Sequence, residues 1–256
     1  MSSPHSDNRR HLLRLWAPAL LLCGVVGALI VAALASGDSA RARTTVFAVL
    51  LVGLFLFGSR AFQKRRFARA LQSPDPTALL RSIAGPVRRV PHGTLLAAAN
   101  SATILALYGR FDEAQHELEA VSWRDIPPLI RAHHTLASAA IAYSSGRVTE
   151  GLAHAVAAVQ EATLDSQFPG AGTSALAFRT YRNLGLALSG RATESTAEEL
   201  NTAFRQLPLL GQITAAWGLA VIARHQHAAP QQQAMRAFIQ ARAPHFAPVF
   251  RSIDTA

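Results

Sequence analysis

The chain has 256 residues, of which 50% are hydrophobic, and a formal net charge of +10 that could suggest nucleic-acid binding. Residues 1–71 hold ten basic and two acidic side chains, a balance of +8, whereas residues 72–256 hold 15 arginines and 13 acids, a balance of +2. The excess positive charge therefore belongs to the N-terminal part, and the rest of the chain is nearly neutral. This distribution argues against a nucleic-acid partner. The single cysteine, Cys23, excludes an intramolecular disulfide.

Two apolar runs without a charged residue dominate the N-terminal part, at 16–35 and 44–59. As a helix, the first run is long enough to cross a hydrocarbon core of ~30 Å, and the second is slightly short. Arginines flank both runs and can reach the headgroups, so the mismatch costs little. We therefore predict an N-terminal tail over residues 1–14 and a transmembrane helical hairpin over residues 15–59.

A cleaved signal peptide is the alternative interpretation. Arg9, Arg10 and Arg14 would form its basic region, and Ala33-Leu34-Ala35 would form its cleavage site. The first apolar run is longer than a usual signal core of ~7–15 residues, and a second run follows at once. These features favour uncleaved helices, whereas cleavage after Ala35 would place the remaining chain in the periplasm.

Basic residues are fewest in the loop between the two runs, which carries only Arg41 and Arg43. The positive-inside rule then places both termini in the cytoplasm of a bacterial-type inner membrane. A basic cluster follows the second run and is a candidate for contact with anionic lipid headgroups; it comprises Arg60, Lys64, Arg65, Arg66 and Arg69. Gly24, Ala28 and Ala32 form a small-residue ladder that would pack on the second span or, in a homo-oligomer, on a second copy.

The rest of the chain predicts helices and no sheet, so the fold class is all-α. Residues 60–93 are interpreted as a basic juxtamembrane segment and a linker helix. Asp75 would cap this helix, Pro76 would occupy its first position, and Gly85-Pro86 would end it. Residues 94–243 are rich in alanine and leucine at helical spacing and form the predicted repeat domain, and residues 244–256 are a C-terminal tail.

A motif that starts with Gly-Arg interrupts these helices at Gly109, at Gly146 37 residues later, and at Gly190 after 44 more. Glycine readily adopts the positive φ that ends one helix, and the Asp or Thr that follows can cap the next. The pattern predicts a row of helical hairpins. A fourth hairpin would comprise Leu209–Gln226 and Pro230–Arg242, without a clear signature.

These hairpins resemble tetratricopeptide repeats (TPRs), whose period is about 34 residues. Gly109–Ala114 matches the turn of that family, and Tyr181-x2-Leu184-Gly185-x2-Leu188 is a fair copy of its helix A signature. Gly151 departs from the usual alanine, residues 165–173 form an insertion, and Gly190 comes two residues early, so an irregular turn is expected there. The resemblance implies a TPR-like α-solenoid of about three to four hairpins over residues 94–243.

No constellation in the sequence indicates catalysis or metal binding. The only lysine, Lys64, lies beside the predicted membrane, so no P-loop is possible. His116-Glu117-Leu118-Glu119 lacks a second histidine, and the adjacent His133 and His134 diverge by ~100° on a helix. We therefore predict no enzyme activity, cofactor or metal; an enzyme acting at the membrane interface is the alternative from another class.

A groove for a protein or peptide partner fits the sequence better. Arg179, Arg182 and Asn183 share one helix face at i, i+3 and i+4, where two guanidiniums and an amide can hold a carboxylate. The competing interpretation pairs both arginines with acids of the same chain. His133 and Asn100 are expected at similar positions along the groove, in earlier repeats.

The predicted function is a membrane-anchored adaptor, and the alternative is a small subunit of a membrane complex held through its spans.

Overall fold

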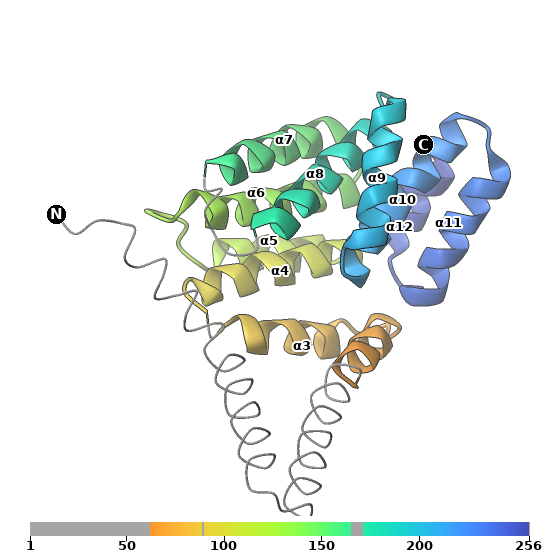
Figure 1. The fold of residues 1–256 in the computed structure, drawn as a ribbon. Helices are drawn as coiled ribbons and strands as arrows, with labels where there is room; N and C mark the ends of the chain where they lie inside the picture. The colour runs from red at the N-terminus through yellow and green to blue at the C-terminus, as the bar shows by residue number, and fades with distance from the viewer. Residues whose placement is uncertain (1–61, 89, 165–170, 256) are drawn as a thin grey trace, which may run out of the picture. The chain divides into compact units, whose positions relative to one another are not determined.

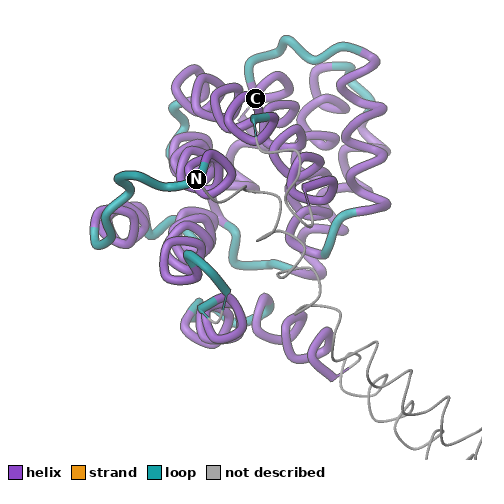
Figure 2. Tube along the Cα trace, turned by 60° about the vertical axis from the view of Figure 1, so that its left-hand side comes forward, coloured by secondary structure: helices purple, strands orange, loops and turns teal. Residues whose placement is uncertain are grey.

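The computed structural model describes residues 62–88, 90–164 and 171–255, and this part of the chain is helical without a strand (Figures 1 and 2). The all-α prediction is confirmed for these residues. The predicted membrane hairpin, with Gly24, Ala28 and Ala32, lies outside the described residues, as does Arg60. Within the described ranges, no helix combines the length and apolarity needed to cross a membrane.

The chain divides into two compact units, Met1–Arg66 and Phe67–Ala256. In the first unit, residues 62–66 are helical, and Lys64, Arg65 and Arg66 are exposed. In the second, residues 67–71 are helical, and Arg69 is exposed. The helices that follow are α3 (Thr77–Val87), α4 (Gly93–Leu107), α5 (Phe111–Glu119), α6 (Pro128–Ser144), α7 (Val148–Thr163), α8 (Ala171–Leu188), α9 (Glu194–Gln206), α10 (Leu209–His225), α11 (Ala229–Arg242) and α12 (Ala247–Thr255).

Helix α3 begins at Thr77, one residue after the predicted start at Pro76, and it ends later than predicted. The Asp75 carboxylate accepts the Thr77 backbone N–H at 3.0 Å and the Thr77 hydroxyl at 2.7 Å, which fixes the start. The predicted end at Gly85-Pro86 is wrong, because the helix continues to Val87. A proline removes one backbone donor, and Pro86 does so only at the last turn of α3, a helix that packs on α4.

Consecutive helices pair as hairpins, α4 with α5, α6 with α7, α8 with α9 and α10 with α11 (Figure 1). The first helices of successive pairs also contact one another. Helices α4 and α10 are apolar on nearly all sides, and every residue from Ile213 to Ala223 is buried. A helix of this kind belongs in a protein interior. The second helices bury only a narrow stripe, such as Ala114 and Leu118 on α5.

The three glycine turns have the geometry that the sequence predicts. Gly109, Gly146 and Gly190 have φ values of 80°, 85° and 69°. The residue after each glycine donates its N–H to the carbonyl five residues earlier, as Arg110 does to Leu105 at 2.9 Å and Arg147 to Ala142 at 2.8 Å. This bond and the bond from the glycine N–H define a Schellman motif at each helix end.

The expected irregularity at Gly190 is absent from the turn itself, because Arg191 donates to Leu186 at 2.8 Å as in the other turns. Residues 191–193 separate this turn from α9, and Thr193 caps that helix in a reciprocal capping box with Thr196. The predicted caps at Asp112 and Thr149 are wrong, because both residues lie inside the first turn of their helices.

The fourth hairpin uses the same turn without a glycine. His227 has a φ of 55°, its N–H donates to the Arg224 carbonyl at 2.9 Å, and the Ala228 N–H donates to the Ala223 carbonyl at 2.8 Å. His227 follows Gly190 by 37 residues, the same interval that separates Gly146 from Gly109. This turn contains no Gly-Arg, so the sequence motif does not mark it.

Replacing His227 by glycine is expected to raise the free energy of unfolding by about 0.5–1 kcal/mol, since histidine at positive φ carries a steric penalty. Gly146→Ala should lower it by about 1 kcal/mol, through backbone strain alone, because an added Cβ meets nothing within 4 Å. The contrast is His227→Gly, which places a glycine at the equivalent turn position and should change stability in the opposite direction. Urea unfolding of residues 67–256 measures each change, and the same sign for Gly146→Ala and His227→Gly would contradict the turn geometry.

The segment 244–256, interpreted from the sequence as a tail, contains the docked helix α12. This helix contacts α4, α6 and α10, and Val249 and Ile253 are fully buried. Trp217 Nε1 donates to Ser252 Oγ at 2.7 Å, and Arg224 Nη1 donates to the Ile253 carbonyl at 2.7 Å. The arginine thus satisfies a carbonyl at the end of α12 that has no partner within the helix.

The two ends of the second unit meet through aromatic and backbone contacts. The Phe246 ring packs edge-to-face on Tyr108, with centroids 5.1 Å apart. The Tyr108 hydroxyl donates to the Ser73 carbonyl at 2.9 Å, and Gln72 Nε2 donates to the Ala241 carbonyl at 3.1 Å. The chain before α3 and the chain around α12 therefore tie the first hairpin to the last.

Candidate functional site

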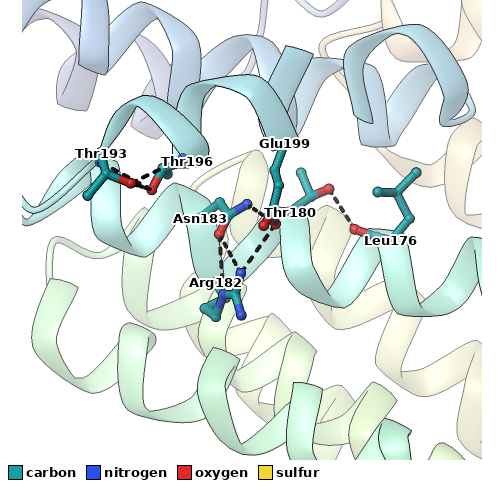
Figure 3. A network of polar contacts seen from close by, with 7 residues as sticks. All are labelled: Leu176, Thr180, Arg182, Asn183, Thr193, Thr196 and Glu199. Atoms are coloured by element: carbon teal, nitrogen blue, oxygen red, sulfur yellow. Dashed lines mark hydrogen bonds and ion pairs between the residues drawn. The ribbon is translucent and has the colours of Figure 1, made fainter. Parts of the chain in front are cut away.

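Two of the predicted groove residues, Arg182 and Asn183 on α8, bind Glu199 of the neighbouring helix α9 (Figure 3). Arg182 Nη2 donates to Glu199 Oε2 at 3.2 Å, and Asn183 Nδ2 donates to the same oxygen at 2.8 Å. Asn183 Oδ1 accepts from Arg182 Nε and Nη2 at 3.2 and 3.1 Å. The three side chains form a closed network inside one hairpin.

Burial makes this network part of the packing between α8 and α9. Asn183 is only 1% exposed, and a buried amide requires hydrogen-bond partners. Glu199 accepts from it, while the Arg182 side chain remains 32% exposed. The carboxylate expected from a partner is thus supplied by the chain itself, and for Arg182 the geometry agrees with the competing interpretation.

The other predicted groove residues occupy different surroundings. Arg179 is exposed on α8, and Asn100 is half-buried on α4. His133 on α6 packs edge-to-face against Phe178 of α8, with ring centroids 5.1 Å apart. Its burial lowers the pKa of His133 to about 4, so the ring is neutral at physiological pH. In the described part of the chain, no hydrogen bond or ion pair joins these residues to Arg182.

A cleft of about 630 Å³ lies between α5, α6 and α7, away from the α8–α9 network. This volume falls in the range of ligand pockets, about 300–1,000 Å³. The cleft is lined by Phe111, Asp112, Gln115, Leu118 and Glu119 of α5, by Val121 and Trp123 of the following loop, by His134, Ser138 and Ile141 of α6, and by Arg147, Glu150 and His154 at α7.

Helix α5 forms an acidic wall of this cleft. Asp112, Gln115 and Glu119 line it at i, i+3 and i+7, so they share one helix face. Gln115 Nε2 donates to Glu119 Oε1 at 2.8 Å, which orients that carboxylate without neutralising it. The range Phe111–Glu119 contains no lysine or arginine.

Charged groups of α7 form the opposite wall. Arg147 Nη1 donates to Glu150 Oε1 at 2.9 Å, an exposed pair at the start of this helix. His154 Nε2 lies 3.8 Å from the same Glu150 oxygen, one helical turn further along. This wall carries one cation against one carboxylate, so it does not cancel the negative charge of α5.

An aromatic pair joins the loop after α5 to α6. The Trp123 ring packs on His134 with centroids 4.5 Å apart, and Trp123 Nε1 donates to the Leu118 carbonyl at 2.7 Å. Burial, with a smaller contribution from His154, lowers the pKa of His134, which keeps the ring neutral at physiological pH. The indole is therefore fixed beside an uncharged partner.

Comparisons with protein-family models, with curated proteins and with solved structures find no match to this chain. Its function is inferred from its own sequence and geometry. Within the described residues, no three His, Cys, Asp or Glu side chains converge to hold a metal ion. His133 and His134 diverge as the sequence predicts, the first toward Phe178 and the second toward Trp123.

The sequence interpretation missed this cleft, although one signal for it was present. Four acids, Asp112, Glu113, Glu117 and Glu119, fall within the nine residues of α5. The wall at α7 could not be predicted from the sequence, because the distance between α5 and α7 depends on how Trp123 and the loop after α5 pack. Only tertiary structure provides that information.

Proposed function

We propose that this protein is a membrane-anchored, TPR-like adaptor whose helical domain faces the cytoplasm and binds a protein partner. Two charge-free apolar runs in the sequence would form the anchor, and the excess basic charge beside them would set its orientation. The domain would carry the binding surface.

The observation that carries the proposal is the recurrence of one helix-ending turn. The Schellman motifs at Gly109, Gly146, Gly190 and His227 each join two helices that pack as a hairpin. Their spacing of 37, 44 and 37 residues resembles the roughly 34-residue period of tetratricopeptide repeats. Stacked hairpins commonly serve as rigid platforms for other proteins.

A rigid platform suits binding, because a surface held in place loses little conformational entropy when a partner docks. The buried helices α4 and α10 and the α8–α9 network supply that rigidity. In this arrangement Arg182 and Asn183 position α9, and Arg179 stays available at the surface as a contact.

The residues after the second apolar run support attachment to lipid. Lys64, Arg65 and Arg66 are exposed, and the nearby Phe62 ring is 63% exposed. Basic side chains attract anionic headgroups, and an aromatic ring is stabilised at the membrane interface. We propose that this stretch lies at the cytoplasmic lipid surface, with Arg60 and Arg69 contributing charge.

Crosslinking in intact membranes, followed by capture of the tagged chain, tests the adaptor function. We expect specific partners of the full-length chain to disappear when residues 73–256 are deleted, because the binding surface lies in the domain. If the shortened chain, which keeps both apolar runs, captures the same partners, the protein is instead a subunit held through its spans. The double variant Arg179→Ala with Arg182→Ala tests whether that edge of α8 contributes.

A further inference from the structure

We propose that the cleft between α5, α6 and α7 binds a cationic side chain, an arginine or lysine presented by an exposed segment of a partner protein. This inference rests on the proposed adaptor function and names the chemistry of the partner. It assigns the recognition surface to a cleft between hairpins, at the second helices α5 and α7, and not to Arg182 and Asn183.

The charge of the cleft selects a cation. Its lining includes the carboxylates of Asp112, Glu119 and Glu150 and one guanidinium, that of Arg147, so these groups carry a net charge of −2. Residues 72–256 as a whole have a balance of +2. The negative charge is therefore a local property of this cleft, and an anionic ligand would be repelled from it.

The acidic wall of α5 keeps its charge available. Glu119 is oriented by the neutral amide of Gln115, and both Glu119 and Asp112 are exposed to solvent at the cleft. On the opposite wall, Glu150 already pairs with Arg147. An incoming guanidinium or ammonium would thus make its charge-assisted hydrogen bonds mainly with α5.

The aromatic residues of the cleft add a second feature that favours a cation. Trp123 and Phe111 both line it, and a cation over an aromatic face gains about 0.5–2 kcal/mol. The hydrogen bond to Leu118 and the packing on His134 hold the indole in place before any ligand arrives. Such preorganisation lowers the entropy lost on binding.

The volume indicates more than a single ion. A cleft of about 630 Å³ accommodates a long side chain together with its flanking backbone. Gln115 and Ser138 offer uncharged hydrogen-bonding groups beside the acids, as a peptide backbone requires. These features fit an arginine-containing segment of a protein.

The test measures binding of a short fluorescein-labelled arginine–serine–glycine peptide to the full chain in detergent, by fluorescence polarisation. The same peptide with citrulline in place of each arginine is the neutral comparison. We expect binding of the arginine peptide below about 1 mM, and binding at least about tenfold weaker for the citrulline peptide. Asp112→Asn combined with Glu119→Gln should also weaken arginine-peptide binding at least about tenfold, because it removes the charge of the α5 wall without changing its shape.

The matched control is Glu194→Gln combined with Glu198→Gln, which removes two exposed acids from α9, outside the cleft. This variant has the same net charge as the cleft variant and should bind the arginine peptide as the wild type does. Equal weakening by both variants would show general electrostatic attraction and overturn the proposal. Equal binding of the citrulline peptide, or no binding at about 1 mM, would overturn it as well.

Failure of this inference is distinguishable from failure of the adaptor function. If the crosslinked partners require residues 73–256 but persist in the Asp112→Asn, Glu119→Gln variant, the adaptor stands and the cleft is not its binding site. If no partner requires residues 73–256, the adaptor function itself fails.

Discussion

Replacing Gly185 by alanine is expected to lower the free energy of unfolding by about 3 kcal/mol or more. Tyr143 of α6 packs directly on this glycine of α8, and its hydroxyl donates to the Tyr181 carbonyl at 3.1 Å. A Cβ at Gly185 would overlap the Tyr143 hydroxyl and lie 2.8 Å from its Cζ. Both helices are buried there, so neither can move aside cheaply.

A double-mutant cycle with Tyr143→Phe isolates the cause. Removing the hydroxyl relieves the worst overlap, so Gly185→Ala should cost less in the phenylalanine background than in the wild type. The control is Gly151→Ala, whose Cβ would lie 2.5 Å from ring carbons of Tyr143 that phenylalanine retains. Tyr143→Phe should not rescue Gly151→Ala. Additive costs for Gly185→Ala and Tyr143→Phe in urea unfolding would contradict this packing.

The second large effect is expected at Phe246, where alanine should lower the free energy of unfolding by about 3–5 kcal/mol. Its side chain is fully buried and packs on Tyr108 at the end of α4, so its loss opens a cavity between the first hairpin and the chain leading into α12. Trp217 donates to Ser252 of α12, so its fluorescence in residues 67–256 with Trp123→Phe, where it is the only tryptophan, reports whether that helix remains docked.

Phe250→Ala provides the matched control for Phe246→Ala. Phe250 is half-buried, with Arg236 over its ring at 5.5 Å, so its truncation should cost only about 1–2 kcal/mol. Equal costs for the two variants, measured by urea unfolding, would contradict the assigned role of Phe246 in closing the domain.

Much of the hairpin arrangement could be predicted from the sequence, because glycine marks a helix end through its own backbone preference. Gly109, Gly146 and Gly190 all carry that local signal, and each ends a helix as predicted. His227 gives no such signal, although its turn has the same backbone hydrogen bonds as the glycine turns. Helix α12 is short, and its burial depends on a surface formed by helices distant in sequence, which a local pattern does not reveal.

In the candidate sites, too, the sequence predicts local features but not contacts between helices. The shared face of Arg182 and Asn183 follows from helical periodicity, but Glu199 reaches them only because α9 folds back on α8. In the cleft, the acidic face of α5 is visible in the sequence, whereas its separation from α7 depends on how Trp123 packs against His134. Sequence periodicity predicts which side chains share a face, and the hairpin packing decides which neighbour they meet.

Cysteine labelling in intact cells tests the central claim, a cytoplasmic domain held by an N-terminal membrane hairpin, most directly. The background is Cys23→Ala, which removes the only cysteine, and single cysteines are then placed at Ser39, in the predicted outer loop, or at the exposed Ser195 of α9. A membrane-impermeant maleimide should label Ser39→Cys in intact cells, but Ser195→Cys only after the membrane is permeabilised. Labelling of Ser195→Cys in intact cells would contradict the claim and place the domain outside.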